Sequence, residues 1–463
     1  MSNKISSPFI FFLTFLLSCH SVHIKASTQT KQSSALSGGG ATVFSSSRNA
    51  FSLPSANMPL LQKLDFNVGN SFFRNPWVIA PASTDARDGL GPLMNTNGCQ
   101  NCHIKDGRGH TPQSLEDNAV SLLVRLSIPS ENGSIPEPNY GDQLQDFAIP
   151  GVKPEGRIQI YYTNKSVIFA DGEKVMLRQP RLSIVDLAYG ELHPQTQFSV
   201  RVAPPMIGLG LLEAIPAENI LKNADPDDNN RDDISGKVNQ VWDITKNAEA
   251  IGRFGWKAGQ PTVRQQNAAA FNGDLGITST LFPLDHCTST QSACLHAPSG
   301  GSPELSENIL NIVTLYARNL AVPARRNIND PQVMVGETLF SEIGCADCHM
   351  ASWKTASDYE LPWLANQTIY PYTDLLLHDM GEGLADNRPE AKANGREWRT
   401  PPLWGIGLTK VVSGETHLLH DGRARNITEA ILWHSGEAEK SQKNFVQLTK
   451  DRRDAVVNFL NSL

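Results

Sequence analysis

The sequence predicts a mainly α-helical protein that contains two similar helical units, with a small β insert in the first unit. Three observations support this prediction. Apolar side chains recur at helical spacing, one short segment occurs twice, and a single stretch alternates in polarity with many β-branched residues. Helices with such spacing bury one face, so two units of this kind can each form a core.

Helical spacing is clearest in the second half of the chain. Apolar side chains at residues 309, 312, 313, 316, 317 and 320 follow the i, i+3, i+4, i+7 pattern, and Pro323 follows them. Asp330 and Pro331 form a typical N-cap and first-turn pair for the next helix. Residues 456–463 carry another apolar stripe, which predicts a C-terminal amphipathic helix.

Two segments of the chain resemble each other. Gly69 and Phe73 precede a Cys-x-x-Cys-His pentad at residues 99–103, and Gly336 and Phe340 precede a second pentad at residues 345–349. In each case Gly-x-x-x-Phe falls on a predicted helix, with a longer insert before the first pentad. The pattern indicates duplication of one helical unit.

A β insert is predicted between the two units. Residues 157–163 and 166–177 alternate in polarity and are rich in β-branched side chains. The pairs Asn164-Lys165 and Asp171-Gly172 are turn signals next to these runs.

Length and composition narrow the class of protein. The chain has 463 residues, enough for two or three domains, and 40% hydrophobic with 19% charged residues is typical of a globular protein. The formal net charge of −7 argues against nucleic acid as a partner, because phosphate binding needs clustered Lys and Arg. Seven cysteines are too few for a disulfide scaffold in so long a chain.

The N-terminal residues predict a targeting signal. Lys4 precedes an apolar run at residues 9–17 that is too short to span a bilayer, which predicts a signal peptide at residues 1–26 and a periplasmic protein. A second interpretation is a lipobox at residues 16–19, in which case Cys19 would be lipidated and would anchor the protein to a membrane. Residues 27–58 are rich in Ser, Thr, Gly and Asn and predict a flexible linker.

The two pentads carry the chemistry. Cys-x-x-Cys-His is the attachment signature of c-type haem, in which two cysteines form thioethers and the histidine ligates iron. Two covalent haems are therefore predicted, with Cys99, Cys102, Cys345 and Cys348 as attachment residues and His103 and His349 as iron ligands. Zinc is the main alternative, but zinc ribbons place their Cys-x-x-Cys pairs roughly 15–20 residues apart. Here more than two hundred residues separate the pairs.

Cys287 and Cys294 lie seven residues apart in a loop rich in Ser and Thr. In an oxidising compartment this spacing predicts a local disulfide. A metal site that uses the flanking His286 and His296 is the alternative.

After residue 60 the chain resembles the di-haem oxidoreductase family of peroxidase-like proteins, related to bacterial di-haem cytochrome c peroxidases and the methylamine-utilisation di-haem enzyme. The resemblance rests on the pentads and on residues 201–213, 274–279, 372–381 and 419–424. It implies two cytochrome c-like haem domains. We place their boundaries at residues 59–328, including the β insert, and 329–463.

The resemblance also implies a ligand on the far side of the second haem. Related enzymes have a His-Asp-Gly turn, here at residues 420–422, followed by a helix that delivers the ligand. The matching position is His434, with His378, Met380 and His417 as alternatives. The first haem has no obvious second ligand. His193 and Met206 are candidates, although core packing fits Met206 better.

Two further residues acquire roles by resemblance. Asp274 would be the acid that moves protons between peroxide oxygens, and Trp256 would relay electrons between the haems. A turn or cap Asp and a core Trp are the structural alternatives. In the segment 225–236, Asp225, Asp227 and Asn229 place oxygen side chains at alternate positions, as calcium loops do, but the terminal Glu and central Gly of an EF-hand are missing. A calcium ion or a solvated acidic turn both fit.

Together these observations predict an exported, peroxidase-like di-haem oxidoreductase in which the C-terminal haem passes electrons to the N-terminal haem. Its partners would be a small redox protein or quinol-linked donor and a small oxidant such as peroxide. The acidic balance favours a basic protein donor. The alternative is a non-catalytic electron-transfer cytochrome with both irons six-coordinate.

Overall fold

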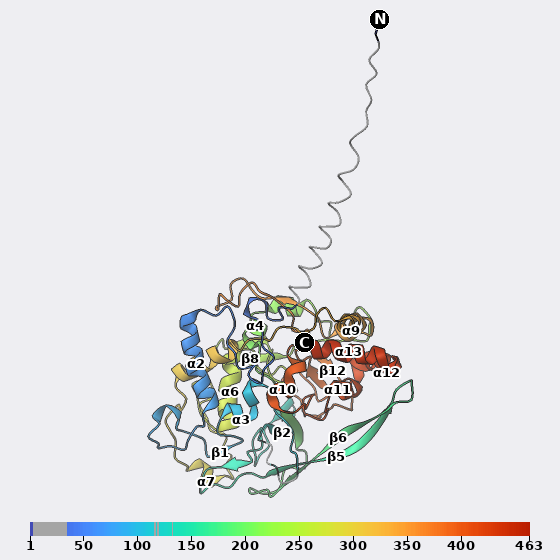
Figure 1. Cartoon of the computed structure of the whole chain (residues 1–463). Helices are drawn as coiled ribbons and strands as arrows, with labels where there is room; N and C mark the ends of the chain where they lie inside the picture. Colours follow the sequence, from blue (N-terminus) through green and yellow to red (C-terminus); the bar gives the residue numbers. More distant parts are fainter. Residues whose placement is uncertain (3–34, 115–116, 118–119, 132) are drawn as a thin grey trace.

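The computed structural model describes the whole chain except residues 3–34, 115–116, 118–119 and 132 (Figure 1). The apolar run of the predicted signal, the lipobox and Cys19 therefore lie outside the described residues. Among the described residues, no helix is long and apolar enough to cross a membrane.

The prediction of a mainly α-helical protein with two cytochrome c-like domains is wrong, because the described residues are only 29% helical and 18% strand. The helices are α2 (Leu60–Arg74), α3 (Cys99–Cys102), α4 (Leu209–Glu213), α5 (Ala217–Leu221), α6 (Val263–Leu275), α7 (Ser292–Leu295), α8 (Glu307–Arg318), α9 (Pro331–Glu342), α10 (Thr409–Ser413), α11 (Ile427–Trp433), α12 (Glu439–Gln447) and α13 (Lys450–Ser462), with short 3₁₀ turns that include η3 (Ile104–Asp106) and η4 (Cys345–Asp347).

The strands form many small antiparallel sheets instead of one layer. In the part of the chain that the structure describes, β2 (Leu122–Ser130) lies between β3 (Gly133–Ile135) and β7 (Gln197–Val202). The other strands pair in twos: β1 (Leu93–Met94) with β4 (Phe147–Ala148), β5 (Arg157–Ile168) with β6 (Lys174–Val185), β8 (Gln240–Asp243) with β9 (Ala248–Ile251), β10 (Trp353–Lys354) with β11 (Thr368–Ile369), and β12 (Leu377–Asp379) with β13 (Glu397–Arg399). Most of these strands have two to four residues, too few to show a period of two in the sequence.

The duplicated helix motif has a packing explanation. Gly69 lies on α2 where α8 crosses it, and a Cβ there would come within 2.5 Å of the Ile312 carbonyl oxygen. Gly336 lies on α9 where α13 crosses it, and a Cβ there would come within 2.5 Å of the Ala455 carbonyl carbon. Only glycine permits such close approach of two helix backbones. The shared motif therefore marks two helix crossings.

The β insert is one long hairpin. Strands β5 and β6 pair over their whole length, from Arg157 opposite Val185 to Ile168 opposite Lys174. The turn falls at Asp171-Gly172, as the sequence predicts, with Gly172 at φ +88°. The predicted turn at Asn164-Lys165 is wrong, because these residues continue strand β5. The hairpin extends from the body of the molecule along α11 and α12 (Figure 1).

The tip of this hairpin docks on the C-terminal helices. Phe169 is buried and its ring lies 6.1 Å from the ring of Phe445 on α12. The guanidinium of Arg453 on α13 lies 3.8 Å from the Phe169 ring centre and pairs with Asp171 at 2.9 Å and Glu173 at 2.6 Å. A segment from the first half of the chain thus braces the second half.

Among the described residues, two large hydrophobic clusters form most of the core, and each includes residues from both sides of position 328. One joins α2, α6 and α8 to Trp404 and Leu408, and the other joins β2, β5 and β6 to α9, α11 and α13. The predicted linker at residues 27–58 also differs from the structure over its described part. Ala41, Ala50 and Phe51 are fully buried there, because small residues let this segment pack closely on the first cluster.

Candidate functional site

One cavity brings the two pentads together. It has a volume of about 410 Å³ and is lined by Cys99, Cys102 and His103 of the first pentad and by Cys345, Cys348 and His349 of the second. The first pentad forms α3 with His103 at its C-terminal end, and the cysteines of the second begin at the short turn η4. Segments far apart in sequence therefore share one internal surface.

The two pentad histidines are held in the same way. Nδ1 of His103 lies 2.8 Å from the carbonyl oxygen of Pro204, and Nδ1 of His349 lies 2.9 Å from that of Tyr372. A carbonyl only accepts hydrogen bonds, so Nδ1 carries the proton and Nε2 keeps its lone pair. Burial lowers the pKa of both side chains to about 4, which keeps the imidazoles neutral. A neutral imidazole fixed through its other nitrogen is a typical iron ligand.

The four pentad cysteines form no disulfide. Burial raises the pKa of Cys99 and Cys345 to about 12. Cys287 and Cys294, by contrast, are joined in a disulfide, which confirms that prediction. The free pairs line the cavity next to the histidines, the chemistry needed for thioether bonds to haem.

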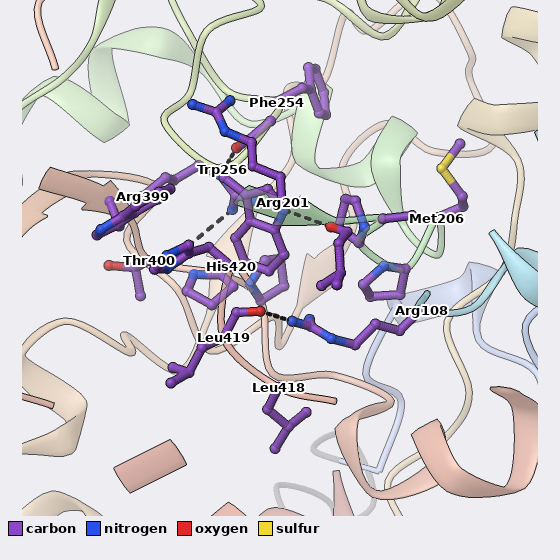
Figure 2. A pocket seen from close by; sticks show the side chains of 18 of the residues that line it. Arg108, Arg201, Met206, Phe254, Trp256, Arg399, Thr400, Leu418, Leu419 and His420 are labelled. Atoms are coloured by element: carbon purple, nitrogen blue, oxygen red, sulfur yellow. Dashed lines mark hydrogen bonds between the residues drawn. The ribbon is translucent and has the colours of Figure 1, made fainter. Parts of the chain in front are cut away.

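Buried arginines line the same cavity. The Arg108 guanidinium donates to the carbonyls of His417 and Leu419, and that of Arg399 donates to Gly255 at 3.0 Å and to Thr400 at 3.1 Å (Figure 2). Burial lowers the pKa of Arg108 to about 9 and of Arg399 to about 10. Cations bonded only to neutral carbonyls suit a ligand that carries carboxylates, and each haem brings two. The lining therefore fits haem.

His434, the predicted second ligand, lies in this cavity just after α11. Its Nδ1 lies 2.7 Å from the carbonyl oxygen of Ala430, so it shares the orientation of the pentad histidines and its Nε2 is free. Burial lowers its pKa, and both His434 and His349 line the cavity. Its role as a ligand stays a prediction.

The two histidine alternatives to His434 bond other groups, whereas Met380 lines the cavity and stays an alternative. Both ring nitrogens of His378 face carboxylates, Glu437 at 2.7 Å and Asp374 at 2.8 Å, which raises its pKa well above the usual value. His417 bonds Thr111 and Glu415 through its two nitrogens. Cys348, Asp374 and His378 lie close enough to hold a metal ion, but that set shares a cysteine with the second pentad.

For the first pentad, Met206 lines the cavity and is also buried in the first hydrophobic cluster. His193 lies elsewhere, where its Nδ1 accepts from the backbone of Gln195 at 3.2 Å. Neither candidate therefore places a free histidine nitrogen at the first pentad to match His434 at the second.

Asp274 and Trp256 both line the cavity. Asp274 is near the end of α6, and its Oδ1 accepts from Nε2 of Gln143 at 2.8 Å, while burial raises its pKa. The Trp256 indole donates to Val202 at 2.9 Å, and the Arg108 guanidinium lies 5.0 Å from its ring centre. Figure 2 shows Trp256, Arg201 and His420 grouped in the centre of the pocket. Their catalytic roles stay predictions.

Sequence reasoning missed a stacked pair beside these residues. Trp398 lies parallel to His420, with ring centres 3.7 Å apart, and both line the cavity. Lys257, fully buried, places its Nζ 4.4 Å from the Trp398 ring centre. Nothing in the sequence around Trp398 marks it, because its partners come from segments far away.

Of the predicted calcium residues, Asp227 and Asn229 are exposed and Asp225 is half-buried. The Asp225 carboxylate accepts from the backbone and side chain of Asn229, at 3.0 and 2.7 Å, so the loop itself uses its oxygens. The structure gives Asp227 no contact that points to a ligand. Calcium at this loop stays a prediction.

A scan against protein-family models matches residues 31–463 to the family described as "Di-haem oxidoreductase, putative peroxidase". The chain belongs to this family. A search of curated proteins finds no match. Among solved structures, a chain of hydrazine synthase from Kuenenia stuttgartiensis is similar at 18% identity with a TM-score of 0.25, over 34% of this chain and 56% of that one. Membership confirms the family resemblance, and a likeness this weak supports no inference about function.

Proposed function

We propose that this di-haem oxidoreductase carries two covalent c-type haems and reduces a small oxidant of the peroxide class at the first pentad. One observation carries the proposal: a single cavity is lined by both pentads, and each pentad histidine is neutral with a free Nε2. His103 and His349 would bind iron, and Cys99, Cys102 and the second pair would bond the haems. When bound, a haem supplies one-electron transfer and, at an open position, peroxide reduction.

The surroundings of the two pentads differ, which supports electron transfer at the second and substrate reduction at the first. His434 offers a second nitrogen near His349, which suits a six-coordinate iron that only transfers electrons. Asp274 faces the cavity with a raised pKa, which suits an acid that donates a proton to a departing oxygen. Electrons would pass from the second pentad to the first, with Trp256 as a relay.

Export is part of the proposal and rests on the sequence alone. The apolar run at residues 9–17 supports a periplasmic location, with Cys19 as the lipid anchor in the second interpretation. The net charge of −7 supports a basic redox protein as electron donor. A quinol-linked donor is the alternative.

Paired cysteine variants test the haem assignment. C99S/C102S and C345S/C348S should each retain one haem per chain by pyridine haemochrome assay and intact mass. C287S/C294S, which opens the disulfide, is the matched control and should retain two. If haem content is the same in all three double variants, the attachment assignment is wrong.

Coordination then distinguishes the enzyme from an electron-transfer cytochrome. The peroxidase proposal expects the reduced wild-type protein to bind carbon monoxide at one haem, and His434→Ala to bind it at two. If the wild-type protein is low-spin in every redox state, binds no carbon monoxide and does not consume peroxide, the chain is an electron-transfer cytochrome and the enzymatic proposal fails.

A further inference from the structure

A row of buried polar side chains leads away from Asp274. Nε2 of Gln143 lies 2.8 Å from Oδ1 of Asp274 and 2.6 Å from Oδ1 of Asn95. Nδ2 of Asn95 in turn lies 2.8 Å from Oδ1 of Asp146 and 2.7 Å from the carbonyl oxygen of Leu144. Gln143 and Asn95 are 3% and 2% exposed, so water does not compete for these bonds.

The hydrogen-bond pattern permits one orientation of each amide. Asn95 spends both N–H groups on acceptors, Leu144 and Asp146, so its oxygen must face Gln143. Gln143 must then present its amide nitrogen to Asn95, and the same NH₂ group reaches Asp274. Turning either amide over would place oxygen against oxygen in a buried site and leave the buried acceptors without a donor.

Asn95 also binds the backbone of Asp274. The N–H groups of Asn95 and Thr96 donate to the Asp274 carbonyl at 2.8 and 3.1 Å. These residues lie just before Cys99 in the chain. The first pentad, Asp274 and the amide row therefore form one connected unit.

We propose that Gln143, oriented by Asn95, is a positioning residue that binds Oδ1 of Asp274 and leaves Oδ2 directed at the cavity. The proposal rests on the acid role of Asp274 proposed above. Among the described residues, Oδ2 of Asp274 has no hydrogen-bond partner, and Asp274 lines the cavity. A proton on Oδ2 would be the one given to an oxygen of the substrate.

Other charges also face Asp274. Arg125 on β2 pairs with Asp142 at 2.8 Å, and His286 lies 3.4 Å from Asp142. The charges of Arg125 and His286 lower the pKa of Asp274, while Asp142 and burial raise it, with burial the largest cause. The N–H of Gln143 lowers it as well, because it favours the carboxylate. Removing that N–H should therefore raise the pKa of Asp274.

Gln143→Met tests this in the di-haem protein, and Gln145→Met is the matched control. Gln145 is also buried and donates to the Gly273 carbonyl at 2.8 Å, as Gln143 does at 3.0 Å, but it does not bond Asp274. The measurement is the infrared C=O band of the protonated carboxyl, assigned to Asp274 by its loss in Asp274→Asn. In Gln143→Met its pH midpoint should rise by about one unit. In Gln145→Met it should not move.

Gln143→Leu is the second variant, because it also removes the N–H that binds Asp274 and should raise the midpoint in the same direction. If the midpoint stays in place in Gln143→Met, or in Gln143→Leu where the first variant does not fold, the positioning role is wrong. The pH profile of peroxide consumption separates the two proposals. If the infrared midpoint rises but the profile does not follow, the positioning role stands and the acid role of Asp274 fails.

Discussion

Replacing Gly336 with alanine tests how closely α9 and α13 cross beside the second pentad. The added Cβ would come within 2.5 Å of the Ala455 carbonyl carbon and 2.8 Å of the Phe459 Cβ. Both contacts are too short to exist, and the first involves backbone, so the two helices must separate. Such overpacking costs about 3 kcal/mol, while the better helix propensity of alanine returns at most about 1 kcal/mol. We expect a net loss of about 2 kcal/mol in the free energy of unfolding.

Gly273→Ala is the control for this prediction. Gly273 is a buried glycine within α6, but a Cβ there would meet its nearest neighbour, Oε1 of Gln143, at 3.7 Å, an ordinary contact. This variant should be as stable as the wild type or gain up to about 1 kcal/mol. Urea unfolding of the di-haem protein, followed by circular dichroism, measures both variants.

A structural consequence can be followed at the same time. Phe340 lies one helical turn after Gly336, and its ring centre is 6.3 Å from that of His349. Separation of α9 from α13 should therefore also change the absorption spectrum of the second haem. If Gly336→Ala unfolds at the same urea concentration as Gly273→Ala, the helices do not cross as closely as described and the packing explanation of the repeated motif fails.

Two further predictions concern the second half of the molecule. Arg453→Met should lower the free energy of unfolding by about 2 kcal/mol, because it removes a cation–π contact with Phe169 and a buried bond to the Leu448 carbonyl. Arg452→Met, whose side chain is half exposed, should cost less than about 0.5 kcal/mol, and equal losses would contradict the docking of the hairpin. Because the pKa of His378 is raised in the folded protein, protonation of this side chain stabilises the fold. This contribution is fully present below about pH 6.5, the pKa of unfolded histidine, and is lost as pH rises through the folded pKa. The unfolding free energy of His378→Gln should therefore fall less with pH in that window than that of the wild type, and parallel profiles would exclude the charged histidine.

The pentads could be found from sequence because their chemistry is local. Attachment requires two cysteines and a histidine within five residues, so spacing alone identifies them. Gln143 could not be found in this way, since it meets Asp274 across 131 residues. Trp398 and His420 likewise meet only through tertiary packing. Residues that position or surround a site need carry no local pattern.

The prediction of the fold class was wrong for a related physical reason. Helical spacing over the longer helices was correctly recognised in α8, α9 and α13, but these make up a small part of the chain. The remainder is dominated by short strand pairs and irregular segments, which 35 glycines and 29 prolines interrupt. The sequence pattern of the long hairpin was visible, although Asn164-Lys165 suggested a turn where β5 continues.

The interleaving of the two halves has a consequence for the cavity. Arg108, just after the first pentad, donates to the carbonyls of His417 and Leu419, and the N–H of Val202 donates to the carbonyl of His420 at 2.8 Å. In the opposite direction, Arg399 of the second half donates to the Gly255 carbonyl of the first half. Each half thus supplies buried bonds that complete the other half's wall of the cavity. The distance between the pentads is therefore set by the fold as a whole, as the proposed electron transfer between two haems would require.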